Sequence, residues 1–158
     1  MNEYMKVALQ LSKENLKTND GGPFGACIVK NGKIIGKGSN HVIKNNDPTA
    51  HAEIMAIREA CSNINSYDLS DCELYTSCYP CPMCLSAIIW ANIKTVYYAN
   101  TKEDASRIGF RDDEIYNFIN DLFDGKSTNQ FLNLKSMSRE DAIKVFDEFT
   151  KKDDKKIY

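Results

Sequence analysis

Apolar residues recur along the first 110 residues at two different spacings, one helical and one strand-like. The helical spacing predicts three helices, at residues 1–18, from a start at 47–49 to residue 60, and at 81–91. Short β-branched and apolar runs predict four strands, at residues 24–29, 34–38, 73–76 and 95–99. Strands that alternate with helices in this order are typical of a layered α/β sheet with crossover connections.

Turn residues separate these segments. Asn31-Gly32 joins the first two strands, and Asn-Gly between strand-like runs predicts a hairpin with positive φ at both positions. Pro82 is compatible with a helix start, because the first turn leaves its N–H groups unpaired in any case. These turn residues therefore mark where the predicted strands and helices begin and end.

Beyond residue 100 the pattern weakens. A helix is expected at residues 112–120, a loop at 125–130, and a helix at 138–150 that Ser138 would cap and Asp141 would reinforce. Residues 151–156 are highly charged and are followed by Ile157-Tyr158. Composition alone predicts a solvated, frayed end here.

Length and composition are those of one ordinary domain. The chain has 158 residues, 42% hydrophobic and 27% charged, so residues 1–158 are expected to form a single domain with its own core. No apolar run approaches the roughly 20 residues that cross a bilayer. Charges throughout residues 1–18 argue against a secretion signal, so we expect an intracellular, cytoplasmic protein without a membrane anchor.

Charge and cysteine content narrow the function classes. A formal charge of −2 and a pI near 5.7 give no general reason to hold a polyanion, which favours a small substrate over nucleic acid. The chain has six cysteines, and disulfides are not expected among them in an intracellular protein. Cys27 and Cys61 lie among apolar neighbours and are expected to be buried thiols.

Two short segments carry candidate metal chemistry. His51-Ala52-Glu53 supplies an imidazole and a carboxylate, and Cys81-Pro82-Met83-Cys84 supplies two thiols on one helical face. Three soft ligands are one short of a closed structural zinc site, so a fourth position stays open for water. If both segments lie at helix starts, two helices converge on one ion, and Glu53 can move the protons of that water.

Other interpretations of these residues exist. Cys-x-x-Cys can be a redox pair or half of a structural zinc knuckle. Cys78 could complete a Cys3His structural site, which would make the chain an interaction domain and not an enzyme. In that case Glu53 would lie beside the metal without a task, so the catalytic hypothesis is favoured.

At these segments the chain resembles the cytidine deaminase-like zinc deaminases, and more closely the bacterial guanine deaminases. The resemblance also extends to the terminal tyrosine and covers nearly the whole chain except about 122–138. It rests on residues 22–26, 46–53, 75–78 and 80–84, and 104–110. Tyr79 departs from the family pattern, which usually has Glu before this proline. The resemblance implies a three-layer α/β/α fold with a central mixed sheet.

The resemblance also implies a metal site and a reaction. His51, Cys81 and Cys84 would bind one zinc ion per subunit, and Glu53 would shuttle protons. The reaction would be the hydrolytic deamination of guanine to xanthine and ammonia, in purine catabolism or salvage.

Five residues would contact the substrate, according to the same resemblance. Asn40 would hydrogen-bond the base, Phe24 would stack on it and Trp90 would wall the pocket. Asp112 would bind the guanine edge and assist proton transfer. Tyr158 would reach a pocket, in the family that of the partner in a homodimer. Whether the C-terminal segment 139–158 is exchanged between subunits or folds back stays open.

Structural roles compete with these assignments. Phe24 and Trp90 could be core residues, Asn40 could shape a strand end, and Asp112 could cap a helix. Bacterial tRNA adenosine deaminases share the metal motifs but typically have a basic surface and lack a Gly-Phe-x-Asp segment with a terminal tyrosine. Gly109-Phe110-Arg111-Asp112 and the acidic balance therefore favour a free purine, although cytosine and guanosine remain alternatives.

Overall fold

The computed structural model describes residues 1–127 and 131–158, and it divides into two units, residues 1–116 and residues 117–158. Positions 128–130 of the expected loop lie outside the described residues. The helices of the described segments are too short or too polar to cross a membrane.

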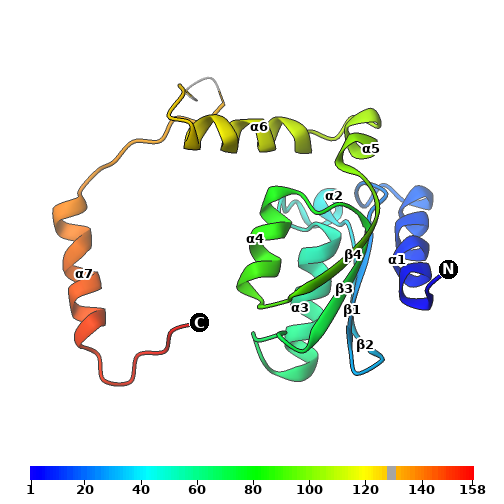
Figure 1. Ribbon diagram of the computed structural model, residues 1–158, viewed down its shortest axis with the longest axis horizontal. Helices are drawn as coiled ribbons and strands as arrows, with labels where there is room; N and C mark the ends of the chain where they lie inside the picture. Colours follow the sequence, from blue (N-terminus) through cyan, green and yellow to red (C-terminus); the bar gives the residue numbers. More distant parts are fainter. Residues whose placement is uncertain (128–130) are drawn as a thin grey trace. The chain divides into compact units, whose positions relative to one another are not determined.

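A mixed four-stranded sheet organises the N-terminal unit, in the order β2-β1-β3-β4 (Figure 1). Its strands are β1 (Gly25–Lys30), β2 (Lys33–Ser39), β3 (Cys72–Cys78) and β4 (Thr95–Asn100). β1 pairs antiparallel with both β2 and β3, whereas β3 and β4 run parallel. The parallel pair requires a crossover, which α4 (Pro82–Trp90) supplies. The prediction of a mixed α/β sheet is confirmed.

The turn between β1 and β2 has the backbone that its sequence requires. Asn31 has φ of 50° and Gly32 has φ of 73°, both in the left-handed region. Such a turn matches the right-handed twist of the two strands. The hairpin predicted from Asn-Gly is therefore confirmed.

Helices cover both faces of the sheet, as Figure 1 shows, with α1 (Glu3–Glu14) on one face and α3 (Ala52–Ile64) and α4 on the other. Side chains of β1 alternate between the faces. Cys27 and Val29 belong to the cluster that packs with α1, and Ala26 and Ile28 belong to the larger cluster under α3 and α4. The predicted three-layer arrangement is confirmed.

Small residues let α3 approach the sheet closely. Its inward face carries Ala52, Ala56 and Ala60, all fully buried. They face Gly36 and Gly38 of β2, where an added Cβ would overlap the carbonyl oxygens of Ala56 and Ala52. This close approach fixes the start of α3, and therefore His51, against the sheet.

The helices differ in extent from the sequence predictions. α1 ends at Glu14 and is followed by the 3-10 turn η1 (Asn15–Lys17), so the predicted helix at 1–18 is too long. α3 begins at Ala52, and Asp47 instead accepts hydrogen bonds from the backbone N–H and the hydroxyl of Thr49, forming a turn before the helix. The helix start predicted at 47–49 is therefore wrong by about one turn. A short helix, α2 (Val42–Asn45), was not predicted.

The remaining helices are α5 (Lys102–Arg107), α6 (Asp112–Phe123) and α7 (Arg139–Lys151). α5 was not predicted, although Thr101 and Asp104 form a complete capping box at its start. Ser138 precedes α7 with φ of 55°, and its hydroxyl makes no capping hydrogen bond. The prediction that Ser138 caps this helix is therefore wrong, because a left-handed backbone does not have the extended conformation usual for a capping side chain. α7 buries none of its residues.

Candidate metal centre and active site

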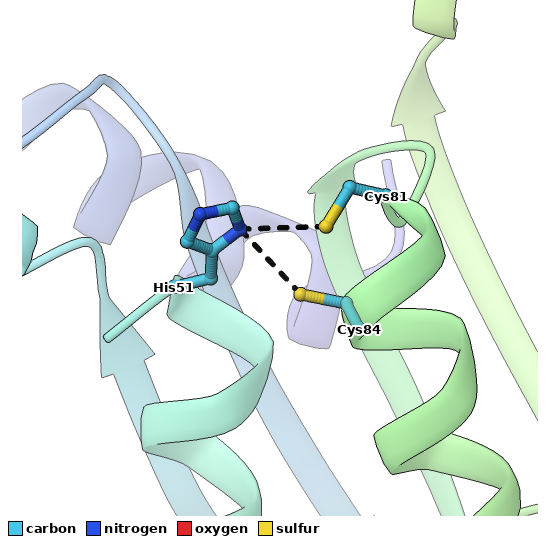
Figure 2. A group of neighbouring side chains, drawn as sticks. All are labelled: His51, Cys81 and Cys84. Atoms are coloured by element: carbon cyan, nitrogen blue, oxygen red, sulfur yellow. Dashed lines mark hydrogen bonds between the residues drawn. The ribbon is translucent and has the colours of Figure 1, made fainter. Parts of the chain in front are cut away.

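Two helix starts meet at one point of the N-terminal unit. His51 is the N-cap of α3, Cys81 is the N-cap of α4, and Cys84 lies in the first turn of α4. The His51 Nδ1 atom lies 3.5 Å from the Cys81 sulfur and 3.6 Å from the Cys84 sulfur (Figure 2). The three ligand atoms all lie within 4.8 Å of one another. Both cysteines are buried.

These distances fit a tetrahedral zinc ion. Zinc–sulfur bonds of about 2.3 Å and zinc–nitrogen bonds of about 2.0–2.1 Å at a tetrahedral angle separate nitrogen from sulfur by about 3.6 Å. The His51–Cys81 and His51–Cys84 separations agree with this value. His51, Cys81 and Cys84 are therefore spaced to hold zinc, with a fourth position for another ligand.

Hydrogen bonding within the cluster shifts the pKa values of its two thiols in opposite directions. Hydrogen bonds from Cys84 and His51 lower the pKa of Cys81 to about 4. The hydrogen bond between the two cysteines raises the pKa of Cys84. The hydrogen bond between His51 and Cys81 raises the pKa of His51. A thiolate at a helix N-terminus is favoured by the free N–H groups there, and thiolates are the form that binds metals.

Cys78 does not join this cluster. Its thiol donates a hydrogen bond to the carbonyl oxygen of Thr101 at 3.4 Å, and burial raises its pKa to about 11. Across residues 1–127 and 131–158, only His51, Cys81 and Cys84 form a ligand cluster of this kind. The four-ligand structural site that Cys78 would complete is therefore not formed. All six cysteines are free thiols, and Cys61 is only partly buried, unlike the fully buried Cys27.

Glu53 lies beside the three ligands and is buried. The Thr76 hydroxyl donates to one carboxylate oxygen at 2.9 Å, and the Cys84 sulfur lies 3.5 Å from the other. Burial raises the pKa of Glu53, and the hydrogen bond from Thr76 opposes that shift. A carboxyl group with a raised pKa, oriented by a neutral donor, can both accept and return a proton.

A cavity opens directly over these groups. Nine residues line it: Phe24, Asn40, His51, Glu53, Cys78, Tyr79, Cys81, Phe110 and Asp112. The cavity therefore brings together two of the three metal ligands, Glu53 and three of the five predicted substrate residues.

Each of those three substrate residues has a defined place. Asn40 is buried after β2, where its side-chain oxygen accepts from the Val42 N–H at 3.2 Å. Phe24 immediately precedes β1. Asp112 is the first residue of α6, and its pKa is raised mainly by burial. A partly buried carboxylate, an amide and an aromatic ring are therefore all available to a molecule in the cavity.

Phe110 and Tyr79 also line the cavity, and the sequence predicted a role there for neither of them. The Phe110 ring meets the Phe24 ring edge to face, with centroids 4.7 Å apart at 80°. The Gly109-Phe110 pair was noted as part of a motif, and its position two residues before Asp112 could have identified it. Tyr79 occupies the position that departs from the family pattern.

Trp90 and Tyr158 are not brought to this cavity by the N-terminal unit. Trp90 is the last residue of α4, at the opposite end from Cys81, and is 64% exposed. Tyr158 belongs to the C-terminal unit and is 76% exposed.

Comparison with protein families agrees with this geometry. The family model described as the cytidine and deoxycytidylate deaminase zinc-binding region matches residues 1–100. The chain belongs to this zinc-binding deaminase family.

The deaminase is similar to two groups of curated proteins. It is 54% identical over 116 residues to the guanine deaminase of Bacillus subtilis, covering 73% of this chain and 74% of that protein. It is 35% identical over 150 residues to the tRNA-specific adenosine deaminase of Aquifex aeolicus, covering 94% and 93%. The crystal structure of Bacillus subtilis guanine deaminase superposes with a TM-score of 0.91 at 44% identity, covering 100% of this deaminase and 99% of that chain.

Proposed function

We propose that this deaminase converts guanine and water to xanthine and ammonia. The observation that carries the proposal is the position of Glu53, buried between Thr76 and Cys84 beside three atoms spaced for zinc. The choice of guanine rests on the 54% identity to a guanine deaminase, compared with 35% to a tRNA-specific adenosine deaminase.

The chain supplies the metal site and the proton transfers. His51, Cys81 and Cys84 would hold zinc, which when bound lowers the pKa of a coordinated water to about 7 in favourable sites. Glu53 accepts a proton from the attacking water and delivers it to the ring nitrogen next to C2. Once the oxygen is bonded to C2, Glu53 takes the remaining proton of that oxygen and delivers it to the amine, so that the C2–N bond breaks and ammonia leaves.

Residues of the cavity orient the base. Phe24 stacks its ring on the face of the purine, because contact between two flat aromatic rings is favourable and excludes water. Asn40 hydrogen-bonds the purine edge. Asp112 binds the guanine edge and assists proton transfer, and burial raises its pKa, which makes the carboxylate a better proton acceptor.

The C-terminal unit completes the enzyme in this proposal. We propose a homodimer in which residues 139–158 contribute Tyr158 to a substrate pocket, with Trp90 as a further wall. The exposed apolar side chains of α7, Val145, Phe146 and Phe149, support the need for a partner surface. One zinc ion per subunit, a cytoplasmic location and a role in purine metabolism complete the assignment.

An ammonia-release assay tests the substrate. Guanine, guanosine, adenine, cytosine and a tRNA anticodon loop are each incubated with zinc-loaded protein. We expect ammonia and xanthine from guanine, with turnover on the other compounds at least tenfold lower. Equal or faster release from the tRNA loop would overturn the assignment.

Deamination of adenosine in tRNA is the second candidate, because tRNA-specific adenosine deaminases match up to 94% of the chain. It predicts RNA binding whose affinity falls steeply with salt, since phosphate contacts dominate such complexes. A salt titration of anticodon-loop binding therefore separates the two. The net charge of −2 supports the small purine.

A further inference from the structure

We infer that Tyr116 is a positioning residue, which fixes the place of the Asp112 carboxylate relative to the metal ligand Cys81. The inference rests on the proposed function and deepens it. Its starting point is one hydrogen bond between two segments that are far apart in the sequence. The Tyr116 hydroxyl donates to the carbonyl oxygen of Pro80 at 2.7 Å.

The acceptor of this bond directly precedes the metal site. Pro80 is fully buried and immediately precedes Cys81, the N-cap of α4. The Pro80 carbonyl lies outside the hydrogen-bond ladder of α4, whose first accepting carbonyl is that of Cys81. The Tyr116 hydroxyl therefore satisfies a buried acceptor at the point where the chain enters the metal centre.

The donor lies one helical turn from the cavity carboxylate. Asp112 and Tyr116 are four residues apart in α6, so their side chains share one face of the helix. Among the hydrogen bonds of the described residues, none is made by the Asp112 carboxylate. Its position is therefore set by where the first turn of α6 lies. A bond from Ser106 to Asp113, at 3.0 Å, is the other side-chain anchor of this turn.

Packing keeps the Tyr116 ring in place. Its centroid lies 6.3 Å from the Tyr79 ring, and the Lys102 ammonium lies 5.4 Å from it. Burial also raises the pKa of Tyr116, so its hydroxyl stays protonated and remains a donor at neutral pH. Removing only the hydroxyl therefore leaves the ring packing and deletes the directional contact.

The expected consequence is a displaced carboxylate and not a lost metal. Displacing a reacting group by about 1 Å can lower the rate about 100-fold. Loss of the single hydrogen bond from Tyr116 should displace the Asp112 carboxylate by less than this, so the loss of rate should be smaller. We expect Tyr116→Phe to lower kcat for guanine about tenfold. Zinc content should stay the same, because none of the three ligands is altered.

Tyr4→Phe is the matched control. The Tyr4 hydroxyl also donates to a backbone carbonyl, that of Gly32 at 3.0 Å, but in the β1–β2 hairpin away from the cavity. Both variants lose one tyrosine-to-carbonyl bond, but the Gly32 carbonyl is exposed and the Pro80 residue is buried, so the melting temperature should fall less in Tyr4→Phe. Only Tyr116→Phe should change kcat.

A double-mutant cycle tests whether Tyr116 acts through Asp112. We expect Tyr116→Phe to lower kcat about tenfold in the wild type but less than twofold in an Asp112→Asn background. Equal losses in both backgrounds, zinc loss in Tyr116→Phe, or a kcat equal to that of Tyr4→Phe would each overturn the inference.

Hydrogen exchange tests the tether without reference to any substrate. Amides of residues 115–118, the first that donate hydrogen bonds within α6, should exchange faster in Tyr116→Phe than in wild type or Tyr4→Phe, and unchanged exchange would overturn the inference. If the wild type releases no ammonia from guanine, the proposed function fails on its own. The cycle is then run on whichever aminated ring the assay shows to react.

Discussion

The two units of this chain use apolar residues in opposite ways. Residues 1–116 bury alanine, cysteine and branched side chains on both faces of a four-stranded sheet. Residues 117–158 leave Phe123, Phe146 and Phe149 exposed. A layered sheet can bury two faces at once, whereas short helices with one apolar stripe need a further surface.

The reacting groups lie in the unit with the packed core, and not in the unit with exposed apolar side chains. His51, Glu53, Cys81 and Cys84 all belong to the N-terminal unit, held at helix starts by the packed core. Of the predicted site residues only Tyr158 lies in the C-terminal unit. Rigid elements hold reacting groups more accurately than loops or tails. The N-terminal unit should therefore carry the chemistry, and the C-terminal unit should affect only substrate binding.

The largest expected effect is that of Glu53→Gln in the N-terminal unit. Glutamine keeps the shape but cannot accept a proton, so turnover of guanine should fall about 10³-fold. Zinc content, measured by atomic emission, should not change because all three ligands remain. Glu59 is an exposed glutamate on the same helix, so Glu59→Gln is the control and should keep full activity. Near-normal turnover in Glu53→Gln would remove the chemistry from this unit.

The next largest expected effect is a difference in stability between glycine-to-alanine substitutions in the two units. A Cβ at Gly38 would overlap the Ala52 carbonyl, so Gly38→Ala should lower the free energy of unfolding by about 2–3 kcal/mol. Gly125 in the C-terminal unit has φ of 71° and nothing within 4 Å of an added Cβ. Gly125→Ala should therefore cost only about 1 kcal/mol, for backbone strain alone. Urea denaturation measures both, and equal losses would contradict the difference in packing.

The features that could be predicted from the sequence are those determined by residues close together along the chain. The Asn31-Gly32 turn is local chemistry, and its positive φ values follow from two residues. The ligand spacing likewise predicts that His51 and Cys81 lie at helix starts. Ser138 shows the limit, because a capping residue type does not determine the backbone angle that capping requires.

Contacts between distant segments could not be predicted in this way. The edge-to-face pair of Phe24 and Phe110, and the bond from Tyr116 to Pro80, depend on how the segment after β4 returns to the cavity. Asn40, Phe24 and Asp112 were assigned through family resemblance and not through spacing. Spacing along the chain carries no information about such returns.

Deletion of Tyr158 tests whether the C-terminal unit contributes to substrate binding. We expect kcat/KM for guanine to fall about tenfold, the loss typical of one aromatic contact, with unchanged zinc content. Lys156→Ala, also in the exposed tail, is the control and should be silent. If deletion of Tyr158 has no effect, the N-terminal unit contains the whole substrate site.

Helix capping gives a smaller contrast between the units. Thr101 caps α5 in the N-terminal unit by accepting from the Asp104 N–H at 3.2 Å, whereas the Ser138 hydroxyl makes no such bond at α7. Thr101→Ala should therefore lower the free energy of unfolding by about 1 kcal/mol. Ser138→Ala should leave it unchanged within error. A measurable loss in Ser138→Ala would show that the serine does cap α7 in solution.

The smallest expected effect is a pH dependence at the same cap. The Asp104 carboxylate accepts from the Thr101 N–H at 3.0 Å and from its hydroxyl at 3.2 Å, and these bonds lower the pKa of Asp104. A lowered pKa in the folded state stabilises the protein above the unfolded value of about 3.9, and this stabilisation is lost as pH falls through the folded pKa. The difference in unfolding free energy between wild type and Asp104→Asn should therefore be constant from about pH 7 to 5. It should shrink below about pH 4, and a difference that persists there would show that the carboxylate charge does not contribute to the cap.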